Sequence, residues 1–135
     1  MPDYGVFVLA APAHAAPIVE ALHSRGLRAW SDCPEQVEVA DARMAWADAV
    51  IVVDNSGMLR IATDPVFRDC NIPKILVTST PLDAMERVWL LERHEFDNVL
   101  AWPSPAEMVA AFAERCVNRG ALPVSYRQVA QNRPA

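Results

Sequence analysis

The stretch that decides the fold is Ala49-Val50-Ile51-Val52-Val53, which is followed at once by Asp54-Asn55-Ser56-Gly57. An apolar run with three valines, bounded by an acid and by turn residues, predicts a strand that is buried on both faces. Such strands lie in the middle of parallel sheets, so this run indicates an α/β domain. Asp54 stands at the carboxyl end of the strand, where open α/β sheets place their ligands. It is the first candidate for chemistry, and its alternative role is to make the turn and cap the next helix.

The chain before this strand has the pattern of two further strands and two helices. Tyr4 to Leu9 is β-branched and aromatic enough for a first strand, and Leu27 to Trp30 predicts a short second strand. Apolar residues at helical spacing follow each of these strands. Gly26 is expected to stop the first helix, and Val37 to Ala47 marks the second.

The chain after the central strand continues the alternation. Thr63-Asp64-Pro65 predicts a short or broken third helix, because proline must interrupt or restart it. A fourth strand is expected over Ile72 to Val77. Thr80 and Asp83 then have the spacing of a helix start and lead into the fourth helix.

The last strand and the last helix complete the pattern. Asn98 to Ala101 predicts the fifth strand. Ser104, Pro105 and Glu107 combine a helix N-cap, a proline at the first helical position and a capping-box glutamate. Gly120 is expected to stop this helix.

Five strands that alternate with five helices predict a doubly wound parallel sheet with helices on both faces, because parallel strands need right-handed crossovers. The flavodoxin-like strand order 2-1-3-4-5 is the common solution at this size. We expect one domain over residues 1–120. Residues 121–135 lose the periodicity and predict a flexible C-terminal tail or a linker.

Composition limits the classes of function. The chain has 135 residues, 53% of them hydrophobic, which suits one compact domain, and its net charge of -5 gives no basic footprint for nucleic acid. No apolar stretch is long enough for a membrane span and no signal peptide is visible, so a cytoplasmic location is expected. The three cysteines and three histidines are scattered, so neither a metal site nor a cofactor is indicated.

Several segments resemble the receiver domains of two-component response regulators. The resemblance spans roughly residues 4 to 119 and is clearest in the second half of the chain. The segments that match that family's last three structural units in order and spacing are Asp64-Pro65 to Asp69, Ile72-Pro73-Lys74-Ile75-Leu76-Val77-Thr78, Asp97-Asn98-Val99-Leu100-Ala101-Trp102-Pro103 and Ser104-Pro105-Ala106-Glu107-Met108.

The resemblance implies a phosphate-handling site of which this chain keeps only part. Receivers accept a phosphoryl group on an Asp after the third strand. Acids after the first strand hold Mg²⁺, and a hydroxyl after the fourth strand and a Lys after the fifth bind the same group. Asp54 lies at or one residue beyond the acceptor position, and Thr78 matches the hydroxyl. Ala10 and Ala11 replace the acidic pair, and Trp102 replaces the lysine.

These replacements predict a degenerate receiver. Magnesium needs oxygen ligands, and two alanines supply none. Loss of the cation and of the lysine removes two main electrostatic stabilisers of phosphoryl transfer. The resemblance therefore implies a pseudo-receiver, which is no enzyme and acts as a phosphorylation-independent protein–protein interaction or signalling module. The alternative is a true receiver that is phosphorylated on Asp54 by an unusual mechanism.

The fourth predicted helix is apolar around more than one stripe. A surface helix needs only one apolar face, so either Trp89 or Leu90 is expected to point away from the core. In the family, the fourth helix, fifth strand and fifth helix form the usual dimer and output face. The matching residues are Arg87, Trp89, Leu90 and Arg93. The partner would be a histidine kinase, a phosphotransfer protein, an output protein or a second copy.

Two other readings come from weaker resemblances. Residues 21–32 and 47–53 are similar to the early strands of Toll/interleukin-receptor domains. Some of those domains cleave NAD and use a Glu on a helix after the central strand. In that region this chain offers only Asp64 and Asp69. A flavodoxin-like nucleotide site would need a phosphate cradle after a strand. Ala10-Ala11-Pro12-Ala13 is no such loop, and Thr78-Ser79-Thr80 can hold an anion or simply cap a helix. The sequence leaves open whether the domain stands alone or belongs to a larger protein.

Overall fold

The computed structural model describes residues 4–34, 44–55, 59, 61–68, 71–94 and 96–118. The elements within these residues are, in order, β1 (Gly5–Leu9), α1 (Pro12–Ser24), β2 (Arg28–Asp32), β3 (Ala49–Asp54), α3 (Pro65–Arg68), β4 (Lys74–Thr78), α4 (Ala84–Glu92), β5 (Asn98–Ala101) and α5 (Ala106–Val117). Most of the second predicted helix, the stop at Gly120 and the predicted tail lie outside the described residues.

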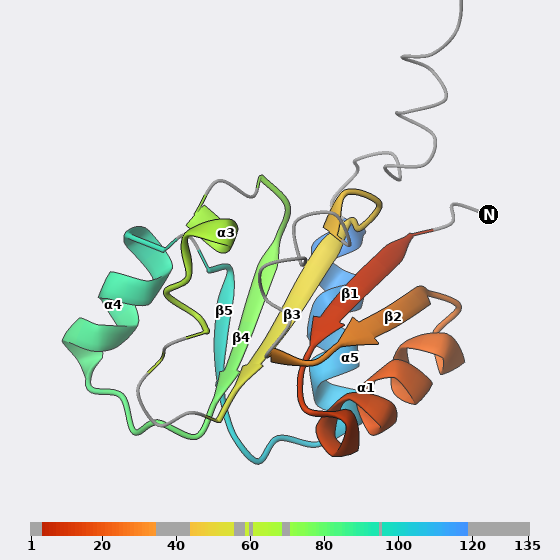
Figure 1. Ribbon diagram of the computed structural model, residues 1–135, viewed down its shortest axis with the longest axis horizontal. Helices are drawn as coiled ribbons and strands as arrows, with labels where there is room; N and C mark the ends of the chain where they lie inside the picture. The colour runs from red at the N-terminus through yellow and green to blue at the C-terminus, as the bar shows by residue number, and fades with distance from the viewer. Residues whose placement is uncertain are drawn as a thin grey trace, which may run out of the picture.

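The five strands form one parallel sheet in the order β2-β1-β3-β4-β5. This confirms the predicted α/β class and the flavodoxin-like strand order. Figure 1 shows α1 and α5 together on one side of the sheet, with α3 and α4 toward the other side and α4 beyond β5. Because all strands run the same way, the ends of β1, β3, β4 and β5 meet at one edge of the sheet, which we call the carboxyl edge.

The core consists of two apolar layers, one on each face of the sheet. All six residues of β3 are buried. Ile51 and Val53 pack into the layer with α1 and α5, whereas Val50 and Val52 pack into the layer with residues of α3 and α4. Alternate residues of a strand point to opposite faces, so a central strand must be apolar at nearly every position. The prediction of a strand buried on both faces is confirmed.

Buried polar groups at the opposite edge of the sheet are bonded to backbone. The amide of Gly5 donates to a carboxylate oxygen of Asp48 at 2.9 Å. The ammonium of Lys74, whose side chain is 1% exposed, donates to the carbonyl of Phe67 at 2.7 Å and to that of His94 at 2.9 Å. These bonds offset the cost of burying the charged side chains of Asp48 and Lys74, and they indicate a structural role for both residues.

Helix termini show both confirmed and corrected predictions. Gly26 follows α1 with φ of +77°, which is the stop that the sequence predicts. The N-cap of α4 is Asp83 and not Thr80, because Asp83 and Glu86 form a complete capping box with bonds of 2.8 and 3.1 Å. The sequence holds two overlapping motifs of this spacing, and the structure uses the second.

The start of α5 also differs from the prediction. The N-cap position belongs to Pro105, and no side chain caps this helix. Ser104 does not cap it, because its hydroxyl donates to the carbonyl of Ala101 at the end of β5.

Among the described helices, none is long and apolar enough to cross a membrane.

Candidate functional site

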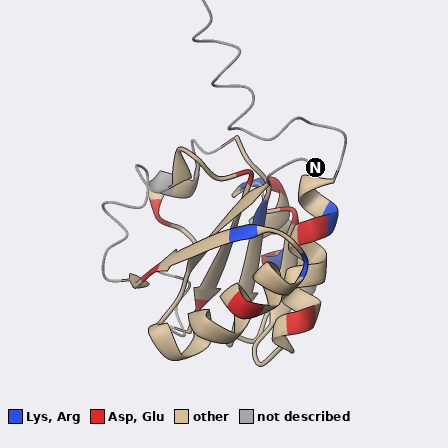
Figure 2. Ribbon diagram, turned by 90° about the vertical axis from the view of Figure 1, so that its right-hand side faces the viewer, with Lys and Arg blue, Asp and Glu red and all other residues tan. Residues whose placement is uncertain are grey.

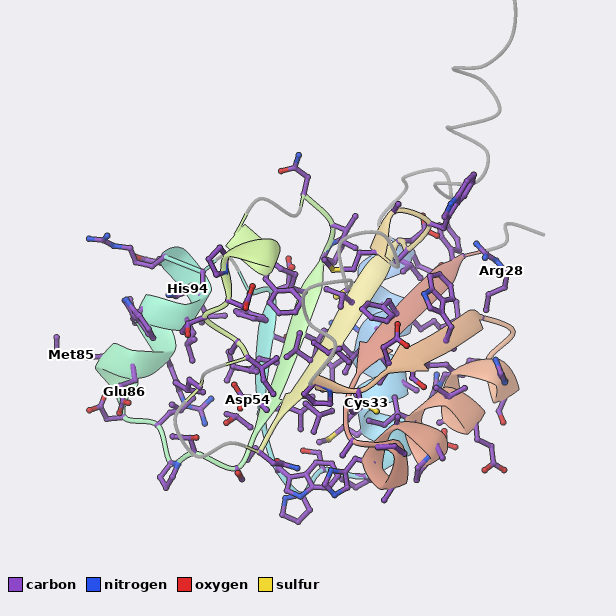
Figure 3. The ribbon with its side chains drawn as sticks, viewed as in Figure 1. Arg28, Cys33, Asp54, Met85, Glu86 and His94 are labelled. Atoms are coloured by element: carbon purple, nitrogen blue, oxygen red, sulfur yellow. The ribbon has the colours of Figure 1, made fainter. Side chains whose placement is uncertain are left out.

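Asp54 lies at the carboxyl edge of the sheet, but its side chain is 0% exposed. One carboxylate oxygen, Oδ2, accepts hydrogen bonds from the amides of Ile61 at 3.1 Å and Ala62 at 3.0 Å. Figure 3 shows the Asp54 side chain among other side chains beside the strands. Its observed contacts are those of a residue that holds the turn after β3, which is the structural alternative that the sequence left open.

The turn that Asp54 holds is itself tightly bonded. The amide and the hydroxyl of Thr63 both donate to the carbonyl of Leu59, at 3.1 and 2.8 Å. Leu59 has φ of +55° and is 7% exposed. A leucine in this left-handed region costs roughly 1–2 kcal/mol, which the bonds of Asp54 and the burial of Leu59 must offset. The Asp54 carboxylate therefore joins the end of β3 to the segment that leads into α3.

Thr78 is the register partner of Asp54 on the neighbouring strand β4. The structure thus brings together the two residues that match the family's acceptor and hydroxyl positions. Thr78 is 2% exposed, and its hydroxyl accepts a hydrogen bond from the amide of Thr80 at 3.1 Å. A threonine that bonds the amide two residues ahead stabilises its own turn.

The end of β1 offers no ligand to a cation. Ala10 is 1% exposed and its amide donates to the carbonyl of Asp32 at 3.1 Å, while Ala11 is the N-cap residue of α1 without a side-chain bond. Mg²⁺ takes oxygen ligands, chiefly carboxylates and water. Across the described residues, no three His, Cys, Asp or Glu side chains gather as a metal site. Neither Ala10 nor Ala11 carries such a ligand on its side chain.

An aromatic cluster crosses the carboxyl edge and joins three elements. The indole of Trp102, just after β5, lies against the imidazole of His14 in α1, with ring centroids 4.4 Å apart. The Nδ1 atom of His14 lies 3.0 Å from the side-chain nitrogen Nδ2 of Asn55, the residue after β3. We call these three residues the edge cluster.

The sequence analysis named Trp102 but missed His14 and Asn55. Both residues follow a predicted strand closely, so a survey of every polar side chain near the carboxyl edge could have found them. The amide of Trp102 donates to the carbonyl of Thr78 at 2.8 Å, which fixes the loop after β5 to β4. Trp102 is therefore held beside Thr78 while its ring reaches α1.

The helix α4 turns most of its apolar residues outward. Leu90 is its only buried residue and is 0% exposed, whereas Trp89 is 43% exposed. The prediction that one of this pair points away from the core is confirmed for Trp89. Leu90 packs into the core, so its inclusion among the surface residues was wrong. The other exposed apolar residues of α4 are Met85 at 83%, Val88 at 50% and Leu91 at 41%.

The remaining candidate residues lie at the borders of α4 or in the turn before α3. The guanidinium of Arg87 lies 3.5 Å from the carbonyl of Val99 in β5, and Arg93 is exposed at the end of α4. Asp64, named for the Toll/interleukin-receptor alternative, is half-buried just before α3, and Asp69 lies outside the described residues.

Comparisons with known proteins identify the fold. No model of a protein family and no curated protein matches the chain. An orphan response regulator of H. pylori superposes with a TM-score of 0.67 at 18% identity, covering 85% of this chain and 97% of that one. The BeF3-activated N-terminal receiver domain of Klebsiella pneumoniae RstA gives 0.61 at 16% identity, with 87% and 100% covered. The non-phosphorylated HemR receiver domain of Leptospira biflexa gives 0.63 at 16%, with 88% and 97% covered. The chain has the fold of response-regulator receiver domains.

Proposed function

We propose that this chain is a receiver-like signalling module that works through protein–protein contacts, without taking a phosphoryl group on Asp54 and without enzymatic activity. The proposal rests on the burial and the hydrogen bonds of the Asp54 side chain. Its carboxylate is fully buried, and one of its oxygens bonds the amides of Ile61 and Ala62. A nucleophilic carboxylate must reach a phosphorus atom in line with the leaving group. Here the turn would have to open first.

The surroundings of Asp54 supply little of what phosphoryl transfer needs. The charge that develops on the transferred group is normally neutralised by a cation and by positively charged side chains. Ala10 and Ala11 offer no ligand to a cation, and Trp102 stands where receivers have their lysine. Each missing stabiliser is worth several kcal/mol of barrier as an order of magnitude. We therefore expect the usual route of phosphorylation to fail.

Without phosphorylation of Asp54, the chain would act through contacts that partners make with its surface. Candidate partners are a histidine kinase, a phosphotransfer protein, an output protein or a second copy, bound through α4, β5 and α5. Trp89, Arg87 and Arg93 are of the residue types that most often dominate binding energy. The side of the molecule that carries β2 has both acidic and basic residues (Figure 2), and the net charge of -5 gives no basic footprint, which favours a protein partner over nucleic acid.

An amide NMR titration of the chain with Mg²⁺ and then with beryllofluoride tests the proposal, because beryllofluoride mimics an aspartyl phosphate without a kinase. We expect no saturable shifts at Asp54, Thr78 or Trp102. The matched control is Asp54→Asn, which shows any shifts that do not depend on the carboxylate. Saturable shifts that vanish in this variant would overturn the proposal.

One observation favours the second candidate function, a true receiver with an unusual mechanism. Asp54 and Thr78 lie side by side in the parallel register of β3 and β4. In that case the turn at Ile61 and Ala62 must open to expose the carboxylate. The same titration decides between the two, because an opened turn would move the amide signals of Ile61 and Ala62 together with that of Asp54.

A further inference from the structure

The strand β2 forms one end of the sheet, and no described strand lies on its outer side. Figure 1 shows β2 beyond β1, and Figure 3 shows Arg28, the first residue of β2, at the border of the molecule. All five residues of β2 are half-buried, whereas every residue of β1, β3 and β4 is buried. β2 is therefore an edge strand.

The backbone of β2 uses only alternate residues to bond β1. The amide of Arg28 donates to the carbonyl of Tyr4 at 2.9 Å, and the carbonyl of Asp32 accepts from an amide just after β1 at 3.1 Å. In a parallel pair, the residues between such bonded positions turn their backbone groups the other way, so those of Ala29 and Ser31 point away from β1. Within the described part of the chain, no strand receives them. An edge of this kind is a template for another strand.

We propose that β2 pairs antiparallel with β2 of a second copy, about a twofold axis at Trp30, so that the two sheets join into one. In this register, Ala29 lies opposite the partner's Ser31 and exchanges two hydrogen bonds with it, and the twofold axis repeats the pair. The inference goes beyond the proposed function, whose surface is made by α4, β5 and α5, and it does not depend on the state of Asp54.

The charges of β2 support a second copy in this direction. Arg28 lies two residues before Trp30, and Asp32 lies two residues after it, so all three share one face of the sheet. When an identical strand is reversed about Trp30, Arg28 of each copy lies directly opposite the partner's Asp32. Opposite charges in such positions stabilise a strand pair. A parallel copy in the same register would instead place like charges side by side.

The large side chain at the centre of β2 does not block this pairing, because it lies over β1. The ring of Trp30 stacks on that of Phe7 with centroids 6.4 Å apart, and a Cβ on Gly5 would lie 2.8 Å from a carbon of the indole. The two residues with outward backbone groups, Ala29 and Ser31, have small side chains. The side chains of β2 therefore leave room for a neighbouring strand at the usual distance of about 4.8 Å.

The length of β2 predicts a weak dimer. The pairing joins five residues from each chain, whereas a standard stable interface takes roughly 20–30 residues from each side. We expect reversible association between micromolar and millimolar protein, and a monomer in dilute solution.

The first test is sedimentation of the full 135-residue chain over that concentration range. Ser31→Pro removes an outward N–H that β1 does not use, so the chain should fold. The dimer loses two hydrogen bonds, and its Kd should rise at least about tenfold. Ser31→Ala is the matched control, because it keeps the N–H and loses only the hydroxyl, and it should leave the Kd unchanged.

A charge exchange tests the register. Arg28→Glu or Asp32→Arg places like charges opposite one another, and each should raise the Kd at least about tenfold. An equal mixture of the two variants restores both opposite-charge pairs and should associate as a heterodimer. These variants carry the test if Ser31→Pro does not fold.

Amide exchange measured by NMR locates the interface. The amides of Ala29 and Ser31 should exchange more slowly as the protein concentration rises, because the partner strand accepts them. A chain that stays monomeric at millimolar concentration would overturn the β2 dimer. So would a dimer that persists in folded Ser31→Pro, or one in which these two amides stay fast, because the contact would then lie on another surface. The beryllofluoride titration is independent of these results, so failure of the β2 dimer leaves the proposed function standing.

Discussion

Replacing Asp54 with alanine should destabilise the domain strongly, because two amide groups lose a buried acceptor. The carboxylate bonds the amides of Ile61 at 3.1 Å and Ala62 at 3.0 Å. Hydrogen bonds to a charged group contribute about 1.5–3 kcal/mol each. The Ile61 bond is only partly buried, so we expect a total loss of about 3–5 kcal/mol in the free energy of unfolding. That loss is a large part of the roughly 5–15 kcal/mol typical of a domain.

Asparagine at the same position gives a graded comparison. Its side-chain oxygen can still accept the two amides, but without the negative charge, so the expected loss for Asp54→Asn is about 1–2 kcal/mol. Urea unfolding followed by circular dichroism gives both values, and hydrogen exchange at Ile61 and Ala62 locates the change. An Asp54→Ala variant within about 0.5 kcal/mol of wild type would refute the reasoning, since it would mean that the carboxylate does not hold the turn.

Three further substitutions test other contacts. Lys74→Met should lower the free energy of unfolding by about 2–4 kcal/mol in urea, because two backbone carbonyls lose a buried charged donor; unchanged stability would show that water replaces the ammonium. Gly5→Ala should cost about 1–3 kcal/mol by the same assay, since a Cβ there would lie 2.8 Å from a ring carbon of Trp30, and a neutral result would mean that the indole moves freely. His14→Ala should shift the emission of Trp102 to longer wavelength with a loss of no more than about 1 kcal/mol, because the ring contact covers one side of the indole; an unchanged spectrum would contradict the edge cluster.

The sheet could be predicted from the sequence because its strands are short apolar runs between turn residues. The fifth strand has the predicted bounds, Asn98 to Ala101, and the central strand is buried as its composition requires. The strand order follows from the crossover rule and from the size of the domain. These properties depend on local pattern and on general topology, which a single sequence contains.

The site depends on contacts that local pattern does not contain. The partners of Asp54 are backbone amides seven and eight residues further along. Backbone amides have no sequence signature, so only the folded turn identifies them. The contact of His14 with Trp102 joins the start of the chain to its last third. The choice between Trp89 and Leu90 was open because both fit a helix, and the position of α4 against the sheet decides it.

The ammonium of Lys74 has a mechanical consequence for α4. It bonds the carbonyl of His94, just after α4, and the carbonyl of Phe67 in α3. A force that displaces this end of α4 must therefore either move α3 with it or break a buried charged hydrogen bond, at about 1.5–3 kcal/mol. The Lys74 ammonium therefore couples this end of α4 to α3, the element that follows the turn held by Asp54, in addition to the apolar layer that Leu90 and Phe67 share.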